Sequence, residues 1–283
     1  MVMVPSLAQG SRLEFAQTLW GPLYEARLNL AGTTATIAPF GDPLHGQPDA
    51  STFTSVGDEQ VVWTWQAGSP DGWDTPLDLR QDSSWQGIIP ILKFNGTDEY
   101  ITTPDAVFWN DTAASSEPSY TWIVWAKLIA GSGIQVLFTK SSVIGNSGQD
   151  WMIHIDGSEQ FTCFIIDDSV GARIGRRNNS SIAGVWHQFA GTKSTGTTAA
   201  AINLYLDGAD IDTNNSNAGS YVNQEDGTGI IAIGSENDGG SMWTGSMAGG
   251  PLGPLFVPAA GTVLTPDVIR RDYELGRKAL GLI

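Results

Sequence analysis

Carboxylates are the side chains of this chain best suited to do chemistry, and their spacing decides which chemistry is open to them. The acidic clusters nearest to a catalytic pattern are Asp98-Glu99, Asp167-Asp168, Glu225-Asp226 and Glu236-Asn237-Asp238. All four lie in turn-like contexts, and adjacent residues of an extended chain face opposite ways. A glycosidase needs two carboxylates that face one cleft. The clusters therefore do not predict hydrolysis, and a divergent glycoside hydrolase stays only as an alternative.

Histidine and cysteine give no stronger signal. The three histidines, His45, His154 and His187, are too few and too scattered for a zinc site. His154 and His187 both fall in strand-like runs, where a structural role is expected. The single cysteine, Cys163, excludes an intrachain disulfide, and its apolar surroundings favour a small buried hydrophobe. Nothing in the chain resembles the nucleophile elbow of a serine hydrolase.

Tryptophan is abundant, with 11 residues in a chain of 283. Flat indole rings stack on sugar faces, so exposed tryptophans would favour a glycan-binding surface. Trp122, Trp125 and Trp186 lie within strand-like runs and are expected in the core. Those beside turn residues are candidates for glycan or protein contacts, with core packing as the alternative: Trp73, Trp85, Trp109 and Trp151.

A framework of short strands must position these residues. The 34 glycines and 14 prolines punctuate runs of alternating, β-branched or aromatic residues, as is typical of an antiparallel many-stranded protein. The number of runs predicts two packed sheets. The predicted strands are 60–66, 91–94, 120–128, 135–138, 151–155, 161–166, 186–191, 202–206 and 230–233.

One helix is predicted near the end of the chain, over residues 264–276. Thr265 suits the N-cap and Pro266 the first helical position, while Gly276 can end the helix.

Residues 1–85 lack a clear periodic pattern and contain two stretches rich in turn residues, 41–49 and 67–76. Two interpretations stay open: extra strands wrapped on the sandwich, or an arm that docks on another subunit. We assign residues 1–85 as an attachment and oligomerisation segment and residues 86–283 as the β-sandwich.

The order of the motifs after residue 86 resembles the laminin-G-like, concanavalin A-like superfamily. The run 92–104 (LKFNGTDEYITTP) and the run 120–127 (YTWIVWAK) are similar to the family's opening strands. The Trp186-His187 strand, followed by the Leu204-Tyr-Leu-Asp-Gly208 hairpin, is its most specific pair. Later similarities are Ile233-Gly234, Trp243-Thr-Gly-Ser-Met247 and the Leu264-Thr265 helix start. The resemblance implies an all-β, antiparallel two-sheet jelly-roll sandwich with a short C-terminal helix and an N-terminal extension.

The resemblance does not by itself imply an activity, because this fold serves many functions. Its glucanases carry a Glu-x-Asp-x-x-Glu strand, which this chain lacks. Its members often bind calcium through rim loops, so calcium is an optional cofactor and none is expected to be required. The residues with suitable chemistry are Asp150, Asp167, Asp168, Asn237 and Asp238, and the alternative is that they are solvated turn acids.

The charge balance limits the classes of partner that this chain can bind. With 30 acidic and 14 basic residues, the chain would be repelled by nucleic acid and by anionic membrane surfaces. The first residues lack a basic region, and Pro5 interrupts their apolar run, so no secretory signal is predicted.

A fold used outside cells, on a chain without a predicted export signal, favours a virion protein assembled in the host cytoplasm. We expect a non-catalytic phage capsid decoration or head/tail fibre protein, a homo-oligomer such as a trimer attached to a capsid or tail protein. The alternative is an exported lectin or adhesin that binds cell-surface glycan outside the cell.

Overall fold

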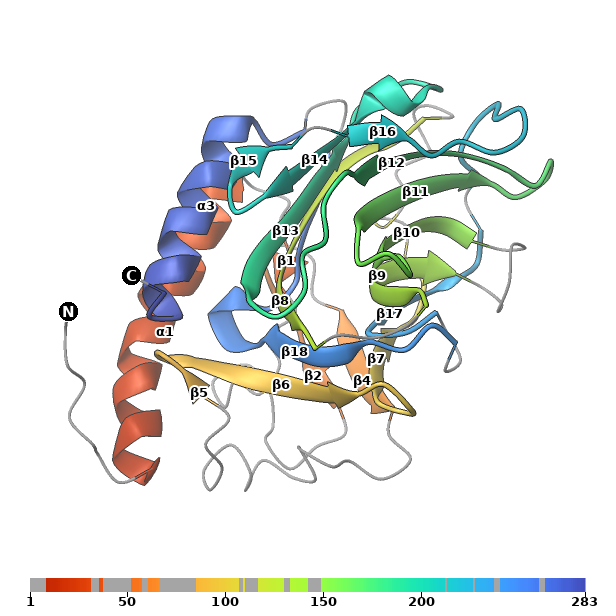
Figure 1. Ribbon diagram of the computed structural model, residues 1–283. Coiled ribbons are helices and arrows are strands. Elements are labelled where there is room, and N and C mark those ends of the chain that lie inside the picture. Colours follow the sequence, from red (N-terminus) through yellow and green to blue (C-terminus); the bar gives the residue numbers. More distant parts are fainter. Residues whose placement is uncertain are drawn as a thin grey trace.

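Two antiparallel sheets face each other in the computed structural model of this protein (Figure 1). The structure describes residues 9–31, 36–37, 52–57, 61–66, 85–106, 109, 117–129, 133–141, 149–211, 213–225, 227–236, 240–259 and 263–282. This architecture confirms the predicted jelly-roll sandwich. In this part of the chain, no helix has the length and hydropathy of a membrane-crossing segment.

The first sheet is ten-stranded in the described residues. Its main path is β15 (Ala209–Asp210), β14 (Ile202–Leu206), β13 (Trp186–Lys193), β8 (Ser119–Leu128), β18 (Thr244–Ala248), β6 (Ile89–Asn95) and β5 (Trp85–Gln86). β19 (Leu255–Ala259) pairs with the first half of β8, and it is followed by β1 (Thr36–Ile37) and β3 (Val56–Gly57).

The second sheet is nine-stranded in the same described residues. Its order is β16 (Thr213–Asn215), β12 (Ala172–Asn178), β11 (Phe161–Asp167), β10 (Gln149–Ile155), β9 (Gln135–Ser141), β17 (Ile230–Ile233), β7 (Tyr100–Thr103), β4 (Val62–Gln66) and β2 (Thr52–Thr54). Two short 3₁₀ turns, η2 (Ala199–Ala201) and η3 (Gly250–Leu252), complete the sandwich.

Aromatic rings fill the space between the sheets. Phe256 of the first sheet packs 5.9 Å from Trp151 of the second, with the rings nearly parallel, and 4.8 Å from Trp109. Trp122 packs 6.4 Å from Trp151. Each such pair contributes about 0.5–1.5 kcal/mol beyond the area that it buries. Cys163 is buried in the same core, as predicted.

The predicted C-terminal helix is present as α3 (Pro266–Ala279). It packs on the outer face of the first sheet through Trp125, whose ring stacks on Tyr273 at 5.6 Å and 6°. Gly276 lies against the same indole, where an added β-carbon would be 2.4 Å from the ring. Glycine at this position therefore lets the helix backbone approach the sheet.

A helix that the sequence did not predict, α1 (Gln9–Ala31), lies beside α3 (Figure 1). It is fastened by Arg27, whose Nε is 2.6 Å from Asp272 Oδ1. The same guanidinium donates to the carbonyls of Pro251 and Gly253. Trp20 donates its indole N–H to the Ile88 carbonyl. The second half of α1 is thus part of the packed domain.

The described strands of residues 1–85 also extend the sandwich. β1 pairs with β19, while β4 joins the second sheet through β7 and carries β2 at its edge. Of the two interpretations left open, the described residues show the first, a segment wrapped on the sandwich. Residue 85 is therefore no structural boundary here, and an attachment role for the segment stays a prediction.

Candidate functional site

A long crossover, residues 216–229, joins β16 at the edge of the second sheet to β17 on the far side of β9. Buried carboxylates from three places in the fold hold its backbone. Asp167 Oδ2 accepts the N–H groups of Val222 at 2.8 Å and Asn223 at 3.2 Å. Glu117 accepts the Gln224 N–H at 3.0 Å, and Asp150 accepts the Gly227 N–H at 3.2 Å. The path of the crossover is therefore fixed.

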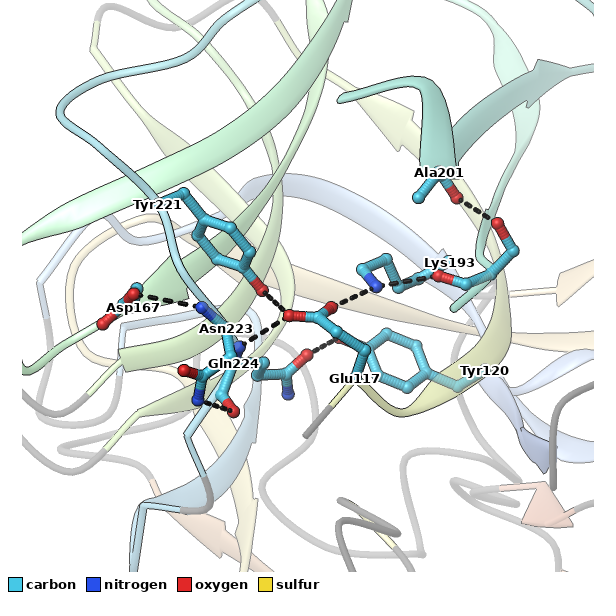
Figure 2. A network of polar contacts seen from close by, with 9 residues as sticks. Glu117, Tyr120, Asp167, Lys193, Ala201, Tyr221, Asn223 and Gln224 are labelled. Carbon is cyan, nitrogen blue, oxygen red and sulfur yellow. Dashed lines mark hydrogen bonds and ion pairs between the residues drawn. The ribbon is translucent and has the colours of Figure 1, made fainter. Parts of the chain in front are cut away.

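Glu117 is the centre of this network (Figure 2). Its carboxylate accepts from Lys193 Nζ at 2.7 Å and from the Tyr221 hydroxyl at 3.0 Å. Tyr120 donates its hydroxyl to the Gln224 side chain. Burial lowers the pKa of Lys193 although Glu117 acts against it, and burial together with Glu117 raises the pKa of Tyr221. These buried, mutually satisfied groups position the crossover.

The predicted calcium ligands are not brought together among the described residues. Asp150 lies in β10, 3.1 Å from Lys140 Nζ, and Asp167 ends β11 with its oxygens turned to the crossover amides. Burial acts to raise the pKa of Asp167, but the hydrogen bonds from Val222, Asn223 and Ser169 outweigh it and the pKa is lowered. The remaining candidates, Asn237 and Asp238, lie outside the described residues.

The part of the chain that the structure describes holds no group of three or more His, Cys, Asp or Glu side chains that could bind a metal ion. Asp150 and Asp167 are buried and hydrogen-bonded, so the alternative of solvated turn acids is wrong for these two residues. The calcium role stays a prediction. Asp168, by contrast, is partly exposed at the turn after β11.

The two predicted contact tryptophans whose side chains the structure describes are not at the surface. Trp109 and Trp151 are 0% and 1% exposed, so neither can stack on a glycan, and their expected contact role is wrong. They pack in the core because both meet Phe138 and Phe256 there. Trp73 and the side chain of Trp85 lie outside the described residues. The alternative of core packing holds for the two that can be placed.

The outward face of the second sheet presents a different arrangement, on the β11–β12 hairpin. Phe161, Cys163 and Ile165 face the core, so alternation turns Phe164 outward. Phe164 pairs with Gly175 across the hairpin, and a β-carbon on Gly175 would lie 2.4 Å from the Phe164 ring. The missing side chain therefore lets the ring lie against the neighbouring strand.

Arg173 lies over this ring. Its guanidinium carbon is 4.0 Å from the Phe164 ring centroid, which is cation–π geometry. The His154 ring centroid is 4.9 Å from that of Phe164, and burial lowers the pKa of His154 to about 3. The backbone of Arg173 is bridged to Ala218 of the crossover by two hydrogen bonds, at 2.8 and 3.0 Å. The crossover thus flanks the site.

Among the described residues outside the core between the sheets, three side-chain atoms of β10–β12 and the turn between β11 and β12 are buried without a hydrogen-bond partner. They are Asp168 Oδ1, Arg173 Nε and His154 Nδ1. An unsatisfied buried polar atom costs about 1–3 kcal/mol, so a ligand that supplied partners would recover that energy. Val170 and Val222, 56% and 59% exposed, lie beside Asp167 at the rim of the same hairpin. The face combines a cation, an acceptor and apolar surface.

Sequence reasoning missed Phe164, Arg173 and Gly175. The signal was present in the alternation of the run 161–167, but the pairing of Phe164 with Gly175 depends on the hairpin register. Asp168 was named, for a different role. His154 and His187 were predicted to be structural: His154 is buried beside the site, and His187 Nδ1 is 2.7 Å from Asp207 Oδ2.

Both binding domains and enzymes are built on a β-sandwich with a crossover beside one sheet face. Comparison with protein families shows to which class this chain belongs. The model of the concanavalin A-like lectin/glucanases superfamily matches residues 95–249, more than half of the chain. The chain belongs to this superfamily. No curated protein matches its sequence.

Solved structures share the fold at low identity. The binding domain of botulinum neurotoxin DC in complex with SialylT matches with a TM-score of 0.54 and 9% identity, covering 87% of this chain and 52% of that one. The binding domain of botulinum neurotoxin serotype D/C VPI 5993 matches with a TM-score of 0.52 and 10% identity, covering 87% and 52%. This chain therefore spans about half the length of the toxin binding domains.

A smaller neighbour is the Ruminococcus gnavus IT-sialidase CBM40 bound to α2,3 sialyllactose. It matches with a TM-score of 0.41 and 14% identity, covering 55% of this chain and 82% of that one.

Proposed function

We propose that this protein is a non-catalytic glycan-binding protein whose ligand lies on the outward face of the β11–β12 hairpin. The observation that carries the proposal is the pair of unsatisfied buried atoms, Asp168 Oδ1 and Arg173 Nε, on one hairpin, where the Arg173 guanidinium covers the buried Phe164 ring. Arg173 is a donor and an ionised Asp168 is an acceptor. A sugar offers hydroxyl groups that serve both, and C–H surface for the exposed side chains of Val170 and Val222.

The same face argues against hydrolysis. A retaining or inverting glycosidase holds two carboxyl groups about 5–9.5 Å apart across the scissile bond. Of the acids in β10–β12 and their turns, Asp150 and Asp167 are committed to the crossover, and Asp156 to the 158–160 turn and Arg177. Glu225 of the crossover reaches the turn that holds Asp168, but its carboxylate accepts the Ser169 N–H at 3.0 Å and is therefore also committed to the backbone. A binding role therefore fits these residues better than an acid–base role.

Binding is tested on a glycan array, followed by calorimetry with the strongest ligand. Replacement of Asp168 by Asn should weaken binding by about 10-fold, because an amide is a poorer acceptor than a carboxylate. The matched control is Asp210→Asn, an exposed acid on β15 of the other sheet, which should bind as the wild type does. Absence of binding to any glycan overturns the proposal.

Catalysis is tested separately, by release of reducing sugar from β-glucans and from the array ligand. No release is expected. Turnover that is lost when one Asp or Glu is replaced would favour the divergent hydrolase instead.

We further propose that the protein is displayed on a phage virion as a homo-oligomer, as a capsid decoration or head/tail fibre protein. The support is the acidic composition, which disfavours nucleic acid and membranes as partners, and a fold suited to exterior binding. Mass spectrometry of purified particles and sizing of the isolated protein test this setting. A monomer found only in the medium or on the surface of uninfected cells would support the exported lectin instead.

A further inference from the structure

The arginines of β12 differ in how their charge is satisfied. Arg176 donates to the Ala199 carbonyl and to the Thr213 hydroxyl, each at 2.9 Å. Arg177 lies 3.4 Å from Asp156 Oδ2. The Arg173 guanidinium has no ion pair and no hydrogen bond within the described part of the chain, although this chain carries 30 acidic residues. Its one ring contact is Phe164.

An unpaired cation in this position is costly to keep. Burial lowers the pKa of Arg173, and no neighbouring acid acts against that effect. The Phe164 ring compensates in part, since cation–π contacts contribute about 0.5–2 kcal/mol. A planar guanidinium has paired donors that match a carboxylate. A ligand anion would therefore satisfy both the charge and the buried Nε.

The charge of the whole protein limits what kind of anion can approach. A chain with a net charge of −16 repels polyanions such as nucleic acid or heavily sulfated polysaccharide. Asp168, on the same hairpin, needs a donor for its buried Oδ1, and a ligand hydroxyl can supply one. The complementary ligand carries one negative group and hydroxyls beside it.

We propose that the site prefers an acidic monosaccharide unit with a single carboxylate, and that Arg173 is the residue that determines this preference. The inference rests on the proposed function, because it names the class of glycan that the Asp168–Arg173 face accepts. Arg173 would pair with the carboxylate through parallel N–H donors, while Asp168 accepts a hydroxyl of the same sugar.

The test is calorimetry with four soluble probes: lactose, 3′-sialyllactose, 3′-sulfolactose and galacturonic acid. Wild-type protein should bind sialyllactose about 10- to 100-fold more tightly than lactose, the range expected for hydrogen bonds to a charged group. Arg173→Gln should remove that difference, and it should weaken sialyllactose binding far more than lactose binding, because a hydrogen bond to a carboxylate is stronger than one to a neutral hydroxyl. Arg173→Lys should restore only part of the difference, since it keeps the charge but not the paired donors.

The matched control is Arg177→Gln, on the same strand and turned to the same face, whose charge is already paired with Asp156. It should keep the wild-type preference. Thermal unfolding of each variant with and without sialyllactose gives a second readout, because a ligand that binds only the folded state raises the melting temperature. Without ligand, Arg173→Gln should unfold near the wild-type melting temperature. Sialyllactose should no longer raise that temperature.

The outcomes separate the inference from the function on which it rests. Equal affinity for lactose and sialyllactose, or an Arg173→Gln variant that keeps the preference, overturns the inference and leaves glycan binding in place. Sulfolactose bound as tightly as sialyllactose overturns the carboxylate preference. A protein that binds none of the probes and no glycan on the array overturns both.

Discussion

The ring of Phe164 occupies the space that a β-carbon on Gly175 would need, with that carbon only 2.4 Å from Phe164 Cδ1. The two residues are partners across β11 and β12, and the Arg173 guanidinium carbon lies 4.0 Å from the centroid of the same ring. Replacing Gly175 by Ala should therefore displace the ring and with it the guanidinium. Overpacking of this kind costs about 1–3 kcal/mol, which urea unfolding would measure.

Gly157 provides a matched control for that change. An added β-carbon there would meet nothing closer than Gly133, at 3.6 Å, which is an ordinary contact. Gly157→Ala should change the free energy of unfolding by no more than about 0.5 kcal/mol. Equal stability of the two variants would show that Phe164 moves aside at no cost.

The Arg27–Asp272 pair should be a principal anchor of α1. Both side chains are buried, and Asp272 also accepts from Gln188 at 2.8 Å. Arg27→Ala leaves a buried carboxylate without its main counter-charge, a loss of about 3–5 kcal/mol. Arg277→Ala is the control, because its contact with Glu274 is at the surface and contributes about 0–1 kcal/mol. Guanidinium unfolding compares them, and equal midpoints would contradict the anchor.

Removal of residues 1–83 should unfold or aggregate the sandwich. The assignment of residues 86–283 as the β-sandwich implies that a truncated protein stays folded. The truncation, however, deletes α1 and β1–β4 and leaves Asp272, the edge of β7 and the edge of β19 uncovered. Exposed strand edges and apolar surface promote aggregation. Circular dichroism and sizing of a protein that starts at Ser84 provide the measurement. A soluble β-rich monomer would restore the division at residue 85.

Acid should weaken the attachment of the crossover through Asp167. Its folded pKa is lowered, so its contribution to stability is present above the unfolded value of about 3.9 and is lost as the pH falls through the lower folded pKa. The free energy of unfolding should therefore fall below about pH 4. Asp167→Asn should flatten this fall, whereas Asp210→Asn, an exposed acid, should leave its slope near that of the wild type.

Calcium should not stabilise the protein through Asp150 and Asp167. Their oxygens already accept crossover amides, and Asp150 is paired with Lys140. A site filled at a hundredfold excess over its dissociation constant would add about 2.7 kcal/mol. The melting temperature in millimolar calcium and in chelator should therefore agree. A shift abolished by replacing Asp150 or Asp167 would show that calcium displaces the amides.

The fold could be predicted from the sequence because its motifs are short runs of consecutive residues, and these runs pair in register in the structure. The Trp186-His187 strand and the Asp207-Gly208 turn are separate motifs, and the structure joins them through His187 Nδ1 and Asp207 Oδ2. Asp207 has a φ of 55° and Gly208 a φ of 73°, as an Asp-Gly hairpin requires. Alternation and turn chemistry therefore sufficed for the sandwich.

The parts that sequence did not predict depend on partners far along the chain. α1 contains Pro22 and lacks an apolar period, and it is held instead by Trp20 on Ile88 and Arg27 on Asp272. Trp109 and Trp151 lie beside turn residues, yet the opposing sheet covers both. The candidate site has the same origin, because Phe164, Gly175 and Arg173 meet only in one hairpin register.

The buried charges also set an order of events during synthesis. Arg27 leaves the ribosome 245 residues before Asp272, and Glu117 leaves it 107 residues before Gln224. Until those partners arrive, each charge must stay hydrated, because burying it alone would cost several kcal/mol. Contacts of such long sequence separation also form slowly. The first strands therefore cannot complete a packed sandwich as they are synthesised. Helix α1 is fixed in place only after α3, which carries Asp272, has been made.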